Sequence, residues 1–172
     1  MKGLVKKLVE MLGDRETYAM AESELTLLRT VALPAMVGEL ASEQPVITSV
    51  RLARLIASSG DEAITELKRH RDNFDEDRDF WLVLALVWVP RTCRENENLW
   101  DFSLRLLDGN RLSEWAACRL LVFVWQFGGA EKRQWIEYNS RFWSDDPEKL
   151  DTVMRLRIGG ALLVESNDLI TQ

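Results

Sequence analysis

The chain has 172 residues, of which 47% are hydrophobic and 29% charged, and 28 Asp and Glu against 22 Lys and Arg give a net charge of −6. This composition excludes a disordered or collagen-like chain, and no run reaches the roughly 20 apolar residues that a membrane-spanning helix needs. The acidic balance also disfavours a nucleic-acid partner, because affinity for DNA comes mainly from Lys and Arg at its phosphates.

The N-terminal segment has apolar residues at helical spacing, with Lys2, Lys6 and Lys7 beside them. Lys6, Lys7 and Glu10 interrupt the apolar run that a signal peptide requires, so we expect a cytoplasmic protein whose cysteines are reduced. A short and weakly basic amphipathic helix of this kind is more typical of docking on its own domain than of membrane binding.

Residues 1–45 are expected to form N-terminal helices with a kink or break at Pro34, because proline removes a backbone donor from a helix interior. Gly60 then separates two further predicted helices, at 46–58 and 61–74. A glycine followed directly by two acids is typical of one helix ending and the next beginning.

Two unbroken apolar runs, at 80–89 and 120–127, fit either a buried helix or a buried strand. We favour helix because no hairpin turn or alternating partner strand lies nearby. The low content of helix breakers, 9 Gly and 4 Pro, also favours an all-α chain. A later helix is expected to begin at Asp146, where an acid precedes Pro147.

The segments repeat along the chain. The apolar segments 83–88 and 120–125 align at a spacing of about 37 residues, and the amphipathic segments 99–107 and 135–143 align at about 36 residues. We therefore expect one helical domain over residues 1–172, with degenerate helix-pair repeats after residue 45.

Both amphipathic segments place an acid four residues before an arginine. This order favours exposed ion pairs from Asp101 to Arg105 and from Glu137 to Arg141. Each amphipathic helix is therefore expected to keep a solvated face beside its apolar stripe.

A repeating pair of one apolar and one amphipathic helix resembles the HEAT-like α-solenoids, over about residues 80–165. The resemblance implies an all-α fold in which antiparallel helix pairs stack as a short solenoid or an irregular helical bundle. It also implies that the protein binds a macromolecule on a curved face.

The sequence predicts no catalytic residues, no metal and no cofactor. His70 lies among cations that disfavour a further positive charge, which is more typical of a surface or helix-end histidine than of a catalytic base. The acidic run that starts at Asp75 matches the first three ligand positions of a calcium loop, but the required glycine and glutamate are replaced by Phe80 and Leu86.

Acidic residues are densest at 72–79, and a second acidic turn lies at 145–148. Trp100 and Trp143 flank the apolar stripes of the amphipathic segments, where they would anchor a partner if exposed or pack between repeats if buried. The acids at 72–79 have an alternative interpretation as a solvated turn in which Asp77 or Asp79 caps the next helix. The predicted partner-binding residues are Asp72, Asp75, Glu76, Asp77, Asp79, Trp100, Trp143, Asp145, Asp146 and Glu148.

The leading hypothesis is a non-enzymatic protein-binding module. It would be an inhibitor, an immunity (antitoxin-type) protein or an adaptor that meets another protein's basic surface with an acidic edge. An alternative is a HEAT-like nucleic-acid-binding protein or DNA glycosylase, with a basic groove made by Arg51, Arg54, Lys68, Arg69 and Arg71. A third hypothesis is a structural subunit of a larger assembly, and the oligomeric state stays open.

Overall fold

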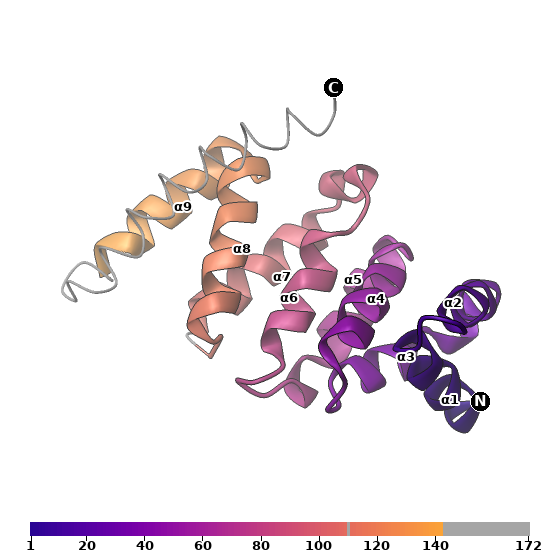
Figure 1. Ribbon diagram of the computed structural model, residues 1–172. Helices are drawn as coiled ribbons and strands as arrows, with labels where there is room; N and C mark the ends of the chain where they lie inside the picture. The colour runs from indigo at the N-terminus through magenta and orange to yellow at the C-terminus, as the bar shows by residue number, and fades with distance from the viewer. Residues whose placement is uncertain (110, 143–172) are drawn as a thin grey trace. The chain divides into compact units, whose positions relative to one another are not determined.

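The computed structural model describes residues 1–109 and 111–142, with side chains through residue 139, and all regular secondary structure in these ranges is helical (Figure 1). The prediction of an all-α fold is confirmed. The chain divides into two compact units, Met1–Ala116 (unit 1) and a second that begins at Ala117 (unit 2).

Unit 1 contains most of the described helices. In chain order these are α1 (Lys2–Leu12), α2 (Tyr18–Leu27), α3 (Arg29–Leu40), α4 (Val46–Ala57), α5 (Asp61–Arg69), the 3-10 helix η1 (Arg71–Asn73), α6 (Asp79–Val87), the 3-10 helix η2 (Arg91–Glu95) and α7 (Glu97–Asp108). Helix α8 (Glu114–Phe127) begins in unit 1 and ends in unit 2, where α9 (Gly129–Phe142) follows.

The amphipathic N-terminal helix docks on its own unit, as its sequence predicts. Helix α1 buries Val5, Leu8, Val9 and Leu12, and it contacts α2, α3 and α4. Its lysines Lys2, Lys6 and Lys7 are exposed. The apolar stripe is therefore part of the core of unit 1.

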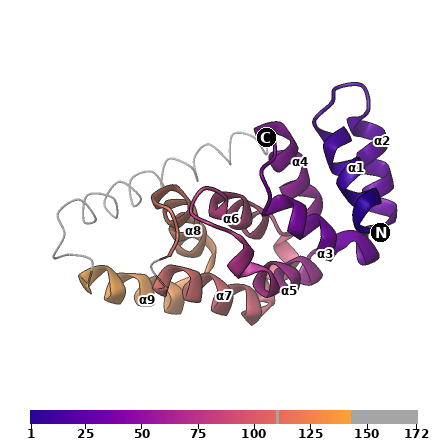
Figure 2. The same cartoon turned by 90° about the horizontal axis from the view of Figure 1, so that it is seen from below.

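The middle of unit 1 consists of two layers of helices. Figure 2 shows α4 and α6 in one layer and α5 and α7 in the other, and helices within each layer contact each other. Each helix thus packs on the helix two places along the chain, which is the contact pattern of stacked helix pairs.

Glycines lie at the junctions between helices where the sequence predicts. Gly60 has a φ of 63°, a conformation that residues with a side chain rarely adopt, and it joins α4 to α5. Gly129 has a φ of 79° and is the first residue of α9, directly after the turn that follows α8. There the Nε–H of Arg133 donates to the carbonyl of Trp125 at 2.6 Å and joins the two helices across the turn.

Both apolar runs are helical. Helix α6 buries every residue from 82 to 87, so it is apolar on all sides and lies inside unit 1. Residues 120–124 of α8 are likewise buried. The strand alternative is wrong for these two runs.

A break at Pro34 is wrong. The chain breaks at Leu28, between α2 and α3, and Pro34 lies inside α3. A proline here removes the hydrogen bond to the carbonyl of Thr30. Because both Thr30 and Pro34 are exposed, water can reach that carbonyl, and the helix continues.

Candidate functional site

The acidic run at 72–79 connects η1 to α6, and its members have different surroundings. Asp75, Glu76 and Asp77 are exposed in the turn. The carboxylate of Asp75 accepts a hydrogen bond from the backbone N–H of Asp77 at 3.1 Å and forms an ion pair with Arg78. Part of the negative charge is therefore balanced within the turn itself.

A hollow of about 270 Å³ lies beside this turn, between the chain after α3 and the start of α6. We call it the acidic hollow. Its exposed carboxylates are Glu43 and Asp77, and the half-buried indole of Trp81 also lines it. The residues that line the acidic hollow are Ser42, Glu43, Gln44, Asp77, Arg78 and Trp81.

The net charge of the acidic hollow is negative although it contains a cation. Arg78 forms its ion pair with Asp75, which does not line the hollow. Arg78 therefore does not neutralise the negative charges of Glu43 and Asp77. The amide of Gln44 donates to Glu39 at 3.2 Å, which holds the connecting segment in place. Two carboxylates beside an indole form a place where a cation is attracted both by charge and by the aromatic ring.

Asp79 is separated from the exposed acids. Asp79 is only 1% exposed. Its carboxylate accepts one hydrogen bond from the backbone N–H of Ser113 and another from the Ser113 hydroxyl, the second at 2.6 Å. Ser113 directly precedes α8. This acid therefore joins the start of α6 to the start of α8, and we leave it out of the surface proposed to meet a partner.

Trp100 is buried, and its indole N–H donates to the carbonyl of Arg94 at 2.7 Å. Its role in the structure is packing on η2. Trp115, which the sequence interpretation passed over, is instead 79% exposed in the first turn of α8. The available signal was its position just ahead of the apolar run rather than within it. The predicted residues outside the described part of the chain are Trp143, Asp145, Asp146 and Glu148.

The five cations that the nucleic-acid hypothesis placed in one groove do not all lie together. Arg51 donates to the carbonyl of Leu12 and lies 4.1 Å from the ring centroid of Tyr18. Arg54 lies over Trp88 at 5.3 Å, and Arg69 pairs with Glu66 at 2.6 Å. These three arginines are therefore engaged within unit 1.

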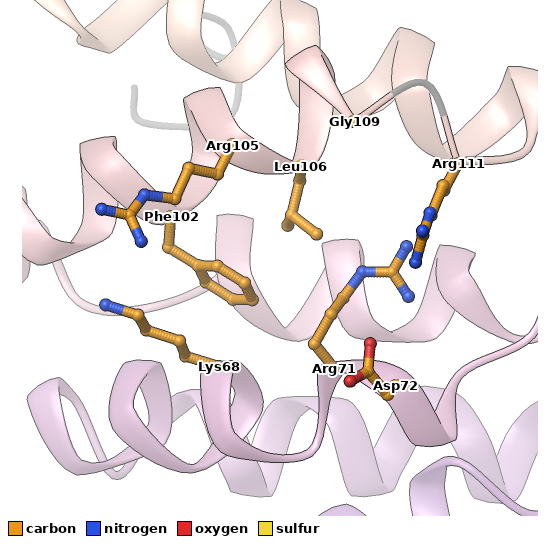
Figure 3. Close-up of a pocket in the computed structure, with 8 residues that line it drawn as sticks. All are labelled: Lys68, Arg71, Asp72, Phe102, Arg105, Leu106, Gly109 and Arg111. Atoms are coloured by element: carbon orange, nitrogen blue, oxygen red, sulfur yellow. The ribbon is translucent and has the colours of Figure 1, made fainter.

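Lys68 and Arg71 line a different groove, whose other cations are Arg105 and Arg111 (Figure 3). Asp72, the first acid of the run, also lines this groove and so does not share the acidic hollow with Asp77. The sequence interpretation missed Arg105 and Arg111 because the packing of α5 on α7 is what brings them into one groove with Lys68 and Arg71. Figure 3 shows Arg105 beside Lys68 and Arg111 beside Arg71.

The expected ion pair between Asp101 and Arg105 does not form, although both residues are exposed on α7. An exposed pair of this kind gains little, so the arginine side chain is free to lie elsewhere. The second expected pair, Glu137 with Arg141, involves a side chain outside the described part of the chain.

The remaining candidate chemistry is internal. The Nδ1 atom of His70 lies 3.0 Å from the carbonyl of Glu66, one turn earlier on α5, so the histidine is at a helix end as predicted. Of the two cysteines, Cys93 is buried and Cys118 is half-buried. Burial, and secondarily the negative charge of Asp61, raises the pKa of the Cys93 thiol above its ordinary value.

Within residues 1–109 and 111–142, no three His, Cys, Asp or Glu side chains gather in a way that could hold a metal ion. In the same ranges, no helix has the length and apolar character to cross a membrane.

The described geometry defines an all-α protein of packed helices with two charged concavities of opposite sign on unit 1. No family model, curated protein or solved structure matches the chain.

Proposed function

We propose that the protein is a non-enzymatic protein-binding module, an inhibitor, immunity (antitoxin-type) protein or adaptor, that holds a basic side chain of its partner in the acidic hollow. The observation that carries this proposal is that Glu43, Asp77 and Trp81 line one concavity. Glu43 and Asp77 are 34 positions apart in the sequence, so the fold is what brings the two carboxylates together.

The chemistry of the acidic hollow suits an arginine or lysine of the partner. Such a cation is attracted by both carboxylates and can lie on the indole face of Trp81. The ring of Trp81 is itself held by an edge contact with Phe80, whose centroid is 5.5 Å away. A ring that is already oriented loses little conformational freedom when the cation binds.

The HEAT-like assignment is part of the same proposal. Its support is the two-layer packing in unit 1, where α4 contacts α6 and α5 contacts α7. Helical-repeat proteins commonly present extended binding surfaces built from successive helix pairs. The acidic hollow lies at the start of such a helix, α6, and next to the segment that precedes α4.

The test uses the full chain and short fluorescein-labelled peptides that carry either arginine or glutamate among neutral residues. We expect the arginine peptide to bind, and Asp77→Lys and Glu43→Lys each to weaken it by about tenfold, because each replaces an attraction with a repulsion. Fluorescence anisotropy at low and high salt gives the dissociation constants, and added salt should weaken binding.

Glu22→Lys on α2 is the matched control, since Glu22 is exposed and lies outside the acidic hollow. It changes the net charge by the same amount and should leave the affinity within about twofold of the parent. Equal weakening by all three variants would show a nonspecific charge effect and would reject the acidic hollow as the site.

A further inference from the structure

The groove in Figure 3 is a second concavity of unit 1, and we call it the basic groove. Its volume is about 500 Å³, and its four cations are Lys68, Arg71, Arg105 and Arg111, against the single acid Asp72. The net charge of the whole chain is −6, so this cluster of positive charge could not be inferred from the net charge. We infer that the basic groove binds an acidic segment of another protein.

The cations of the basic groove are available to a ligand. Lys68, Arg105 and Arg111 form no ion pair with any residue in the described part of the chain. Arg71 donates one N–H to the carbonyl of Phe74 at 3.2 Å, which orients its guanidinium without balancing its charge. Figure 3 shows the guanidinium groups of Arg71 and Arg111 directed toward each other, an arrangement that an anion between them would stabilise.

Arginine dominates this set of cations. A guanidinium presents paired N–H donors that match the two oxygens of a carboxylate or of a phosphate, whereas an ammonium acts as a point charge. Three arginines around one groove therefore fit a ligand with several anionic groups. The arginines alone do not distinguish carboxylates from phosphates.

The rest of the basic groove favours a peptide. Asp72 can only accept hydrogen bonds when ionised, and a peptide supplies backbone N–H donors along its whole length. The phosphate groups of a nucleic acid supply none, so only its bases and sugars could donate to Asp72. Phe102 and Leu106 lie between the cations in Figure 3, but both are nearly buried, so they form a narrow apolar strip. Such a strip can contact an aliphatic side chain, but it does not offer the open aromatic face on which nucleic-acid bases stack.

The test uses the full chain and a short fluorescein-labelled peptide in which Asp and Glu surround one Leu. We expect Arg105→Glu and Arg111→Glu each to weaken binding of this peptide by about tenfold in fluorescence anisotropy, because each variant replaces a charge-assisted hydrogen bond with repulsion. Arg15→Glu is the matched control, since Arg15 is exposed between α1 and α2 and should leave binding unchanged.

Single-stranded RNA and DNA of equal charge are the competing ligands. Tighter binding of either one, with the same sensitivity to Arg105→Glu, would overturn the peptide assignment in favour of nucleic acid. Equal loss in Arg15→Glu, or no loss in the two groove variants, would overturn the site itself. Both groove positions are exposed, so the circular dichroism melts of the variants should match that of the parent.

This inference does not depend on the acidic hollow. Asp77→Lys should leave binding of the acidic peptide in place, and Arg105→Glu should leave binding of the arginine peptide in place. The two proposals can therefore fail separately.

Discussion

The carboxylate of Asp79 is bonded to a residue 34 positions further along the chain. Replacing it in Asp79→Asn retains the size but places an amide NH₂ against one of the two Ser113 donors. We expect a loss of about 2–3 kcal/mol in the free energy of unfolding, because a buried charge-assisted hydrogen bond is replaced by an unsatisfied donor. Urea unfolding followed by circular dichroism measures it.

Ser113→Ala is the matched variant for this prediction. It removes only the hydroxyl bond to Asp79 and keeps the backbone one, so the expected loss is about 1 kcal/mol. If Asp79→Asn unfolds at the same urea concentration as the parent, the bond between the starts of α6 and α8 contributes nothing to stability.

The buried thiol of Cys93 makes stability depend on pH in the alkaline range. Its pKa is raised in the folded state, so between the ordinary and the raised value the unfolded chain has lost a proton that the folded chain keeps. The free energy of unfolding should therefore fall as pH rises above the ordinary thiol pKa of about 8.5. Urea unfolding at a series of alkaline pH values should show a shallower fall for Cys93→Ala than for the parent.

Val89→Ala is the control, because Val89 is as buried as Cys93, each being 4% exposed, and has no titratable group. Its profile should keep the slope of the parent. An unchanged slope in Cys93→Ala would contradict the assignment of this pH dependence to the Cys93 thiol.

Neighbouring acids in the 72–79 run show the limit of residue-level prediction. The sequence indicated a charged turn and allowed that Asp77 or Asp79 has a structural role. It did not separate Asp77, which lines the acidic hollow, from Asp79, which is bonded to Ser113. The difference arises from contacts with distant segments, and local composition carries no record of those contacts.

At the scale of the elements, two leucines of α1 test whether this helix is docked on unit 1. Leu12 is 0% exposed, whereas Leu4 on the same helix is 49% exposed. Leu12→Ala should lower the free energy of unfolding by about 2–5 kcal/mol, because it leaves a cavity in the core of unit 1. Leu4→Ala should change it by less than about 0.5 kcal/mol.

Thermal and urea unfolding of the two leucine variants distinguish the alternatives. If α1 were a membrane-seeking segment undocked from unit 1, the two substitutions would have equally small effects on stability. A large effect confined to Leu12→Ala matches the buried face of α1.

Helix positions were predictable because they depend on local sequence. Gly60 separates α4 from α5 as expected, and the helix expected at 46–58 is observed as Val46–Ala57. The break near Pro34 was placed wrongly because the cost of a proline depends on whether the freed carbonyl meets water. That exposure is a property of the assembled unit.

For the whole molecule, net charge and charge distribution carry different information. The total of −6 predicted a preference for basic partners, yet the basic groove and the acidic hollow both lie on unit 1. A sum over the chain does not record which charges share a surface. Electrostatic steering of a partner is determined by the local arrangement as well as by the total.

The sequence by itself determined the helical class, the positions of several helices and the recurrence of apolar and amphipathic segments, because periodicity and helix-ending residues act over a few positions. Only the tertiary structure decided that Glu43 and Asp77 line one hollow, that Arg105 and Arg111 share a groove with Lys68 and Arg71, and that Asp79 bonds Ser113. These juxtapositions result from helices packing on partners distant in sequence. A site built by such packing has no local signature.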